Sequence, residues 1–157
     1  MKTLEALILI ALADSTLNLR ADDIKLEQCP AAVQDTIRAN ARDGRIDDIN
    51  LITIEDRTLY VVEVDLKGGK DLKLHVGSDG KQIKTREDAA LSDAPDAVQD
   101  AVKKLVPAGG KVDDVDKEIA AGKVTYHVEI DRPNAADLDA VVADDGTVIR
   151  RTEEARD

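Results

Sequence analysis

Apolar and polar positions alternate along four stretches of the chain, and this pattern predicts β-strands. The apolar set of the first two stretches is Tyr60, Val62, Val64 and Leu66, then Leu72, Leu74 and Val76. The second two stretches carry Tyr126, Val128 and Ile130, then Leu138, Ala140 and Val142. A period of two marks strands that have one dry face and one solvated face. Turn signals separate them at Gly68-Gly69, Asp79-Gly80, Gly122 and Asp145-Gly146, because glycine accepts the positive φ of tight turns.

A helical spacing of apolar residues precedes the alternating stretches in each half of the chain. Val98, Val102 and Leu105 define one apolar stripe, and Val33 and Ile37 define a weaker one. Each stripe follows a proline, which is tolerated in the first turn of a helix. These starts are Pro30 and Pro95, and the expected ends are Gly44 for the first helix and Pro107 with Gly109-Gly110 for the second.

The two halves resemble each other over most of their length. "PAAVQDTI" faces "PDAVQDAV" at an offset of 65, and the offset then becomes 66 and holds to the end of the chain. Such internal similarity predicts two copies of one folding unit. The expected fold class is therefore α+β, with two tandem repeats that each place a helix before a roughly four-stranded antiparallel sheet. The expected boundaries are 22–88 and 89–157, with residues 86–94 as a polar linker.

The composition predicts how each core is built. The chain has 157 residues and neither Phe nor Trp, so its only aromatic side chains are Tyr60 and Tyr126. Val, Ile, Leu and Ala must therefore fill the core, and aromatic side chains normally bury the largest areas. We expect each tyrosine to anchor one half-core beneath a helix. Roughly 60 residues bury too little surface to be comfortably stable alone, so the two units should pack together.

The charge of the chain excludes some classes of partner. Its 33 acidic and 22 basic residues give a formal net charge of −11, and no basic cluster offsets it. Such a field repels phosphate backbones, so nucleic-acid binding is disfavoured. Anionic membrane surfaces are disfavoured for the same reason.

The N-terminal segment predicts export. Lys2 precedes an apolar run from Leu4 to Ala13, and both Ala11-Leu12-Ala13 and Ala21 offer small residues for cleavage. This order is typical of a secretory signal peptide, expected over residues 1–21. The run is too short to span a bilayer, so no membrane span is expected. An ordinary amphipathic helix is the alternative. Export would place the protein in the periplasm or outside the cell.

The motifs shared by the two halves resemble a known family. A "P-x-A-V" helix start, a "Y-x-V-E-[VI]-D" strand and a "D-G" turn that leads into Ile look like the PepSY-like family, which is similar in fold to the β-lactamase-inhibitor proteins. The resemblance covers nearly all of residues 29–154, as two copies. It implies an exported bacterial protein of tandem helix-plus-sheet units that bind or inhibit other proteins, including peptidases. Most aromatic positions of such cores are missing here, and no inhibitory loop can be transferred.

Candidate chemistry is sparse, and we expect no enzyme and no cofactor. There is no G-x-S-x-G motif, no glycine-rich phosphate loop and no Cys/His pair at useful spacing. His127, Glu129 and Asp131 share one strand face, but residues two apart on a strand are about 6.6–7 Å apart and cannot close around one metal ion alone. "GSDGK" and "ADDGT" lack the twelve-residue ligand pattern of a calcium loop, so they are interpreted as turns.

Cys29 is the only cysteine, so no internal disulfide can form. Its place beside the expected helix start could lower the pKa of its thiol and make it reactive. The alternative is a small filler of the core, because Ala94 stands at the matching position of the second half.

The sequence leaves one surface as the candidate for function. We expect a non-catalytic binding module that offers its uncovered sheet face to a protein or peptide of the cell envelope. The residues assigned to that face are Val61, Glu63, Asp65, Lys73, His75, His127, Glu129 and Asp131. Apolar residues and histidines interrupt its carboxylates, as on a binding surface, although plain solvation explains the same pattern. The alternative function is binding of a metal or small molecule through His75 and His127.

Overall fold

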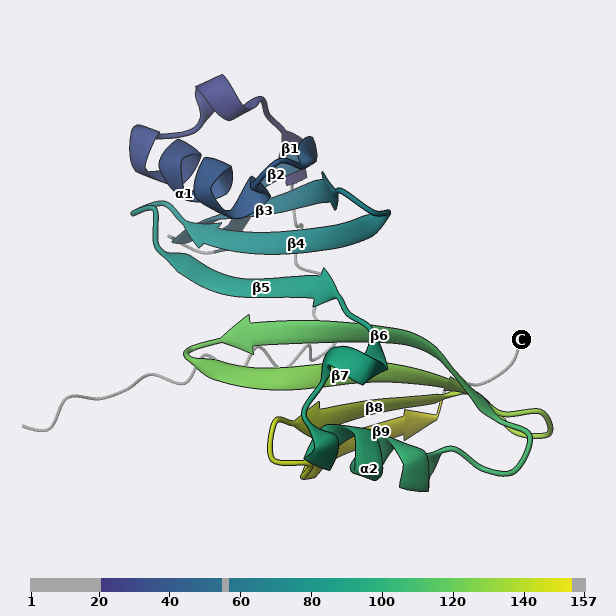
Figure 1. Cartoon of the computed structure of the whole chain (residues 1–157). Helices are drawn as coiled ribbons and strands as arrows, with labels where there is room; N and C mark the ends of the chain where they lie inside the picture. Colours follow the sequence, from purple (N-terminus) through teal and green to yellow (C-terminus); the bar gives the residue numbers. More distant parts are fainter. Residues whose placement is uncertain (1–20, 55–56, 154–157) are drawn as a thin grey trace, which may run out of the picture.

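The computed structural model describes residues 21–54 and 57–153. Its helices are α1 (Ala31–Ala41) and α2 (Asp96–Leu105), each preceded by a short 3-10 turn, Leu26–Gln28 and Leu91–Asp93. Its strands are β1 (Ala21–Asp23), β2 (Arg45–Ile54), β3 (Arg57–Leu66), β4 (Lys70–Gly77), β5 (Gln82–Asp88), β6 (Lys111–Ala120), β7 (Lys123–Asp131), β8 (Leu138–Ala143) and β9 (Val148–Glu153) (Figure 1). The expected signal peptide lies outside the described residues, apart from Ala21, which opens β1.

The strands form one continuous sheet, so the prediction of two tandem helix-plus-sheet repeats is wrong. All nine strands are antiparallel and lie in sequence order from β1 to β9. Residues 84–88 of β5 pair with residues 116–120 of β6, which joins the two halves at the middle of the sheet. Residues 86–88, assigned to a linker, therefore belong to β5. Alternation of apolar and polar residues does not show which strand pairs with the outer edge of another. Strands pair through backbone groups, which every residue carries.

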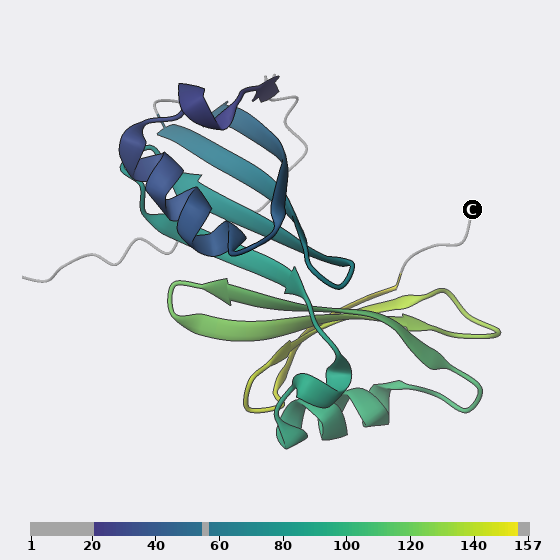
Figure 2. The ribbon, with the colours of Figure 1, turned by 45° about the horizontal axis from the view of Figure 1, so that its top comes forward.

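Both helices cover the same face of the sheet. Directly opposite residues on neighbouring strands point to the same face, and Leu74, Thr85 and Ile119 stand opposite one another across β4, β5 and β6. Lys117 lies two residues before Ile119 and therefore on the same face of β6, and it stands opposite Tyr126. Tyr126 thus points to the same face of the sheet as Leu74. Helix α1 lies on β3 and β4, and α2 lies on β8 (Figure 1). Figure 2 shows the strands turning steadily from the first half to the second, as sheets twist.

Each helix covers a separate core, and the two tyrosines are buried as predicted. Tyr60 lies in the core beneath α1, together with Cys29, Val33, Ile37, Ala41, Ile49, Val62, Val64, Leu66, Leu72, Leu74 and Val76. Tyr126 lies in the core beneath α2, together with Ala94, Val98, Val102, Val115, Val128, Ile130, Leu138, Ala140 and Val142. No residue belongs to both cores. Each tyrosine therefore anchors its own half of the sheet.

The two Asp-Gly sequences form turns, as predicted, and each turn rests on the start of a helix. The Asp79 carboxylate accepts a hydrogen bond from the Lys81 amide at 3.1 Å, and Asp145 accepts one from Thr147 at 2.8 Å. Gly80 has a φ of 78°, and a Cβ there would stand 2.7 Å from Ala32. These turns need glycine both for their backbone and for contact with the helix.

The described part of the chain contains no helix that is long and apolar enough to cross a membrane.

Candidate functional site: the open face of the sheet

The open face is the side of the sheet opposite α1 and α2. Strand alternation places on it all eight residues that the sequence assigned to a binding surface, because their neighbours Tyr60, Val62, Tyr126 and Val128 point into the cores. The eight residues form two groups. Val61, Glu63, Asp65, Lys73 and His75 lie on β3 and β4, whereas His127, Glu129 and Asp131 lie on β7. Strands β5 and β6 separate the groups.

The first group combines one uncharged pair with one ion pair. Val61 stands directly opposite His75, and Glu63 stands directly opposite Lys73. The Lys73 ammonium lies 2.9 Å from the Glu63 carboxylate, with both side chains about half exposed. An exposed pair of this kind contributes only about 0.2–1 kcal/mol. Its main effect is to cancel charge beside Val61 and His75.

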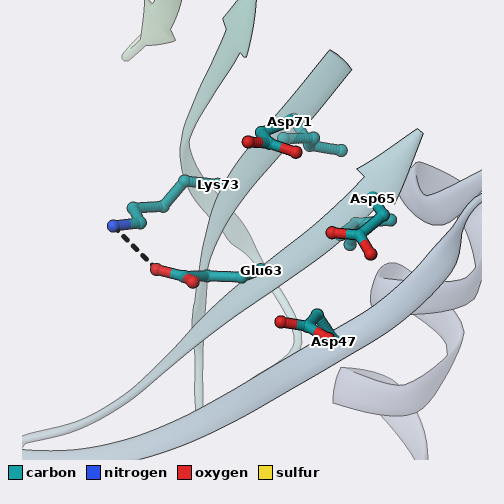
Figure 3. A pocket seen from close by; sticks show the side chains of 7 residues that line it. Asp47, Glu63, Asp65, Asp71 and Lys73 are labelled. Carbon is teal, nitrogen blue, oxygen red and sulfur yellow. Dashed lines mark ion pairs between the residues drawn. The ribbon is translucent and has the colours of Figure 1, made fainter. Parts of the chain in front are cut away.

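A shallow hollow of about 260 Å³ opens beside this ion pair. Glu63 and Asp65 reach it from β3, and Asp47 and Asp71 reach it from β2 and β4 (Figure 3). Arg45 pairs with two of these carboxylates, Asp47 and Asp65. The hydrogen bonds that the Arg45 guanidinium donates to these two carboxylates, Asp47 first, raise the pKa of Arg45. The hollow is therefore acidic, but its charges are partly neutralised.

The second group repeats the uncharged pair in reverse order. His127 stands directly opposite Val141, so the histidine is now on the earlier strand. Lys111 takes the role of Arg45, because its ammonium lies 2.7 Å from Asp113 and 2.6 Å from Asp131. These two carboxylates, Asp113 first, hold the pKa of Lys111 far above its ordinary value.

The strand positions beside Glu129 differ in charge from those beside Glu63. Glu129 stands opposite Asp114 on one side and Asp139 on the other, so three carboxylates follow one another across β6, β7 and β8. Like charges directly opposite each other destabilise a sheet. The open face is consequently more acidic in its second half.

The seam between the halves carries charged residues that the sequence analysis missed. Arg86 on β5 brings both Nε and Nη2 to 2.6 Å from Oδ2 of Asp116 on β6. Lys84 lies 3.4 Å from Glu118, whose other neighbour is Nε2 of His127 at 3.3 Å. The sequence does contain a signal for these pairs. The cations of "KTR" (residues 84–86) and the carboxylates of "DKE" (residues 116–118) are each two residues apart, so each set lies on one face of its strand. The two sets predict ion pairs only once β5 and β6 are known to be neighbours.

Both imidazoles are neutral at pH 7. Burial, reinforced by Lys84 and Lys73, lowers the pKa of His75 from 6.5 to about 4. Burial is also the first cause that lowers the pKa of His127, and Arg86 adds to it. Two uncharged Val–His pairs therefore interrupt a charged face.

The two histidines cannot share a metal ion. They lie on β4 and β7, three strand spacings apart, which is about 14 Å across the sheet. Within residues 21–54 and 57–153 no three His, Cys, Asp or Glu side chains are grouped so that they could hold a metal. The geometry thus disfavours the metal-binding alternative.

Cys29 is a core residue. It is buried, and burial followed by the nearby Glu27 raises the pKa of its thiol. Ala94 is buried at the corresponding place in the second core. The structure therefore supports the filler interpretation rather than a reactive thiol.

Comparison with known proteins identifies the fold. The chain is similar to a DUF2874 family protein from Bacteroides uniformis, with 21% identity, a TM-score of 0.61 and coverage of 80% of this chain and 89% of the other. It is similar to a BLIP-like protein from Bacteroides fragilis, with 15% identity, a TM-score of 0.58 and coverage of 80% and 86%. The chain has their fold. No protein-family model and no curated protein matches it.

A third similar structure, from Bacteroides eggerthii, is provisionally described as periplasmic. It has 18% identity, a TM-score of 0.62 and coverage of 80% of this chain and 88% of the other. The expected likeness to β-lactamase-inhibitor proteins is thus supported at the level of a BLIP-like fold. The PepSY-like resemblance and its tandem repeats gain no support from these neighbours.

Proposed function

We propose that this protein is an exported, non-catalytic binding module that holds a protein partner on the open face of its sheet. The observation that carries the proposal is the position of both helices on one face, so that no helix among residues 21–54 and 57–153 covers the opposite face of the nine strands. The protein works in the periplasm or outside the cell, in agreement with its N-terminal pattern and with the periplasmic description of a neighbour of the same fold.

The side chains of the open face suit contact with a protein. Interfaces place uncharged anchors inside a polar rim. Two uncharged pairs lie on this face, Val61 with His75 and His127 with Val141. Ion pairs between basic and acidic side chains lie near them. The charges at the seam are already paired, so covering them leaves few isolated ions.

The BLIP-like protein of the same fold supports a protein as the class of partner. Inhibition of a particular enzyme is not part of the proposal. Binding of a metal or small molecule through His75 and His127 is the weaker candidate because the two imidazoles lie on strands that are not neighbours.

Affinity capture from the envelope and secreted fractions tests the proposal. Glu63→Lys with Glu129→Lys reverses two charges on the open face, and Asp35→Lys with Asp100→Lys makes the same change in net charge on the exposed sides of α1 and α2. We expect the first double variant to lose a partner that both the wild type and the second variant retain. Equal capture by all three proteins would contradict the proposal.

A further inference from the structure

Strand β9 lies at one edge of the described sheet. Among the described residues, β9 pairs with β8 on one side only. It is six residues long, whereas β1 at the other edge has three. A strand of six residues offers a partner more backbone groups than a short edge strand does. Within residues 21–54 and 57–153, no strand pairs with the outer backbone groups of β9.

The molecule itself shows how a strand of this kind is completed. Lys84 of β5 stands opposite His75, and Arg150 of β9 stands opposite Val141 at the corresponding place in the second half. Both strands also carry an exposed isoleucine at a bulge, Ile83 at 52% and Ile149 at 59% exposure. The outer edge of β5 is filled by β6, antiparallel to it.

The acidic side chains of β6 are complementary to the basic side chains of β5. Glu118 stands opposite Arg86 in register, yet its carboxylate reaches diagonally to within 3.4 Å of Lys84. Asp116 lies 2.6 Å from Arg86. An acidic antiparallel strand thus meets the cations of β5 on the open face.

We propose that β9 binds an extended acidic segment of a partner protein, which adds to the sheet as a tenth strand in the manner in which β6 follows β5. Main-chain hydrogen bonds to β9 supply affinity in such strand addition, and alternate side chains supply specificity. Arg150 and Arg151 are exposed cations on an otherwise acidic protein, and no ion pair within the described chain engages either side chain. They point to opposite faces, so Arg150 meets the carboxylates that a strand like β6 carries on the open face, and Arg151 adds positive charge on the other face of the same edge.

The occupant is a partner rather than a second copy of this chain. The acidic strand that fits β5 is β6, and in every copy β6 is enclosed between β5 and β7. The net charge of −11 also opposes close approach of two copies. A partner with a free acidic segment meets neither obstacle.

A peptide that copies β6, Lys-Val-Asp-Asp-Val-Asp-Lys-Glu-Ile-Ala with blocked ends, is the probe. We expect titration into the full-length protein to shift the backbone amide NMR signals of β8 and β9 and to slow hydrogen exchange in β9. A peptide with lysine in place of every acidic residue, and one N-methylated at alternate positions, should each fail to do so. Unchanged β9 signals up to the solubility limit of the acidic peptide would overturn the proposal, as would equal binding of the N-methylated peptide.

A pair of charge variants separates local recognition from net charge. Arg150→Gln with Arg151→Gln should weaken binding of the acidic peptide about tenfold at low salt, because it removes the cation that meets the peptide's carboxylates and a second cation of the same edge. Lys103→Gln with Lys104→Gln removes the same charge from the exposed end of α2 and should leave binding unchanged. Equal weakening by both variants, or a dimer in sedimentation that buries β9, would overturn the inference. Because the Glu63→Lys and Glu129→Lys variant leaves β9 intact, failure at the open face and failure at β9 give different results.

Discussion

The two halves of the sheet share one backbone plan but not one set of side chains. Strands β2 to β5 with α1, and β6 to β9 with α2, follow the same order, and positions 66 apart fall in the same register. Ile37 and Leu74 of the first core correspond to the smaller Val102 and Ala140 of the second. The comparison teaches that turns and alternation fix the backbone plan, whereas core volume can fall by several methylenes without changing it.

The two halves differ more strongly at the outer edges of β5 and β9 and on the open face. The outer edge of β5 is filled by β6, while β9 ends the described sheet. On the open face, Lys73 neutralises Glu63, whereas Asp139 in the corresponding place repeats the charge of Glu129. Side chains that face solvent or a partner have therefore diverged in sign, whereas core pairs such as Leu74 and Ala140 have diverged in size.

Truncation of the tyrosines gives the largest expected effect. Tyr60→Ala and Tyr126→Ala should each reduce the free energy of unfolding by about 3–5 kcal/mol, as for other large aromatic deletions from a core. Because the two cores share no residue, the losses should add in the double variant. Chemical denaturation followed by circular dichroism measures them. A loss below about 1 kcal/mol for either tyrosine would mean that it is not an anchor.

Exchange of Leu74 and Ala140 tests whether the smaller core is as tightly packed as the larger. Leu74→Ala should cost about 2–5 kcal/mol, because Leu74 is fully buried. Ala140→Leu should cost about 1–3 kcal/mol by overpacking, because Ala140 is 1% exposed. Denaturant midpoints of both variants check these values. A stabilised Ala140→Leu protein would show that the second core contains unfilled space.

Acidification should weaken the first half through His75. The pKa of His75 is about 4 in the folded protein and near 6.5 when unfolded, so the unfolded chain binds the extra proton first. Stability should therefore fall as pH drops from about 6.5 to about 4 and depend less on this group below that window. His75→Val, which copies Val141 of the second half, should make the decline shallower. An unchanged slope of unfolding free energy against pH would contradict the assignment.

Charge exchange on the open face gives the smallest expected effect. Asp139→Lys copies the Glu63–Lys73 pair into the second half and should stabilise the protein by about 0.2–1 kcal/mol. Lys73→Asp should destabilise it by a similar amount. Both changes should shrink at high salt, because these side chains are accessible to solvent. Denaturation at low and high ionic strength measures the difference, and an effect that ignores salt would exclude an electrostatic origin.

The local structure of this protein follows from its residue types alone. Prolines placed the starts of both helices, Asp-Gly pairs placed two turns, and period-two alternation placed Tyr60 and Tyr126 in the cores. It also placed eight side chains on the open face, since alternation assigns a face to every residue of a strand. These features depend on the conformations of a few neighbouring residues, which the residue types control directly.

The way in which the two halves combine became visible in the folded chain. The pairing of β5 with β6 turned an expected linker into the middle of one sheet, and it brought Arg86 to Asp116 and Lys84 to Glu118. It also left β9 at an edge and showed that both helices share one face. Strand neighbours are joined by backbone hydrogen bonds that are the same for every residue type, so their choice depends on the packing of the whole chain rather than on any local pattern.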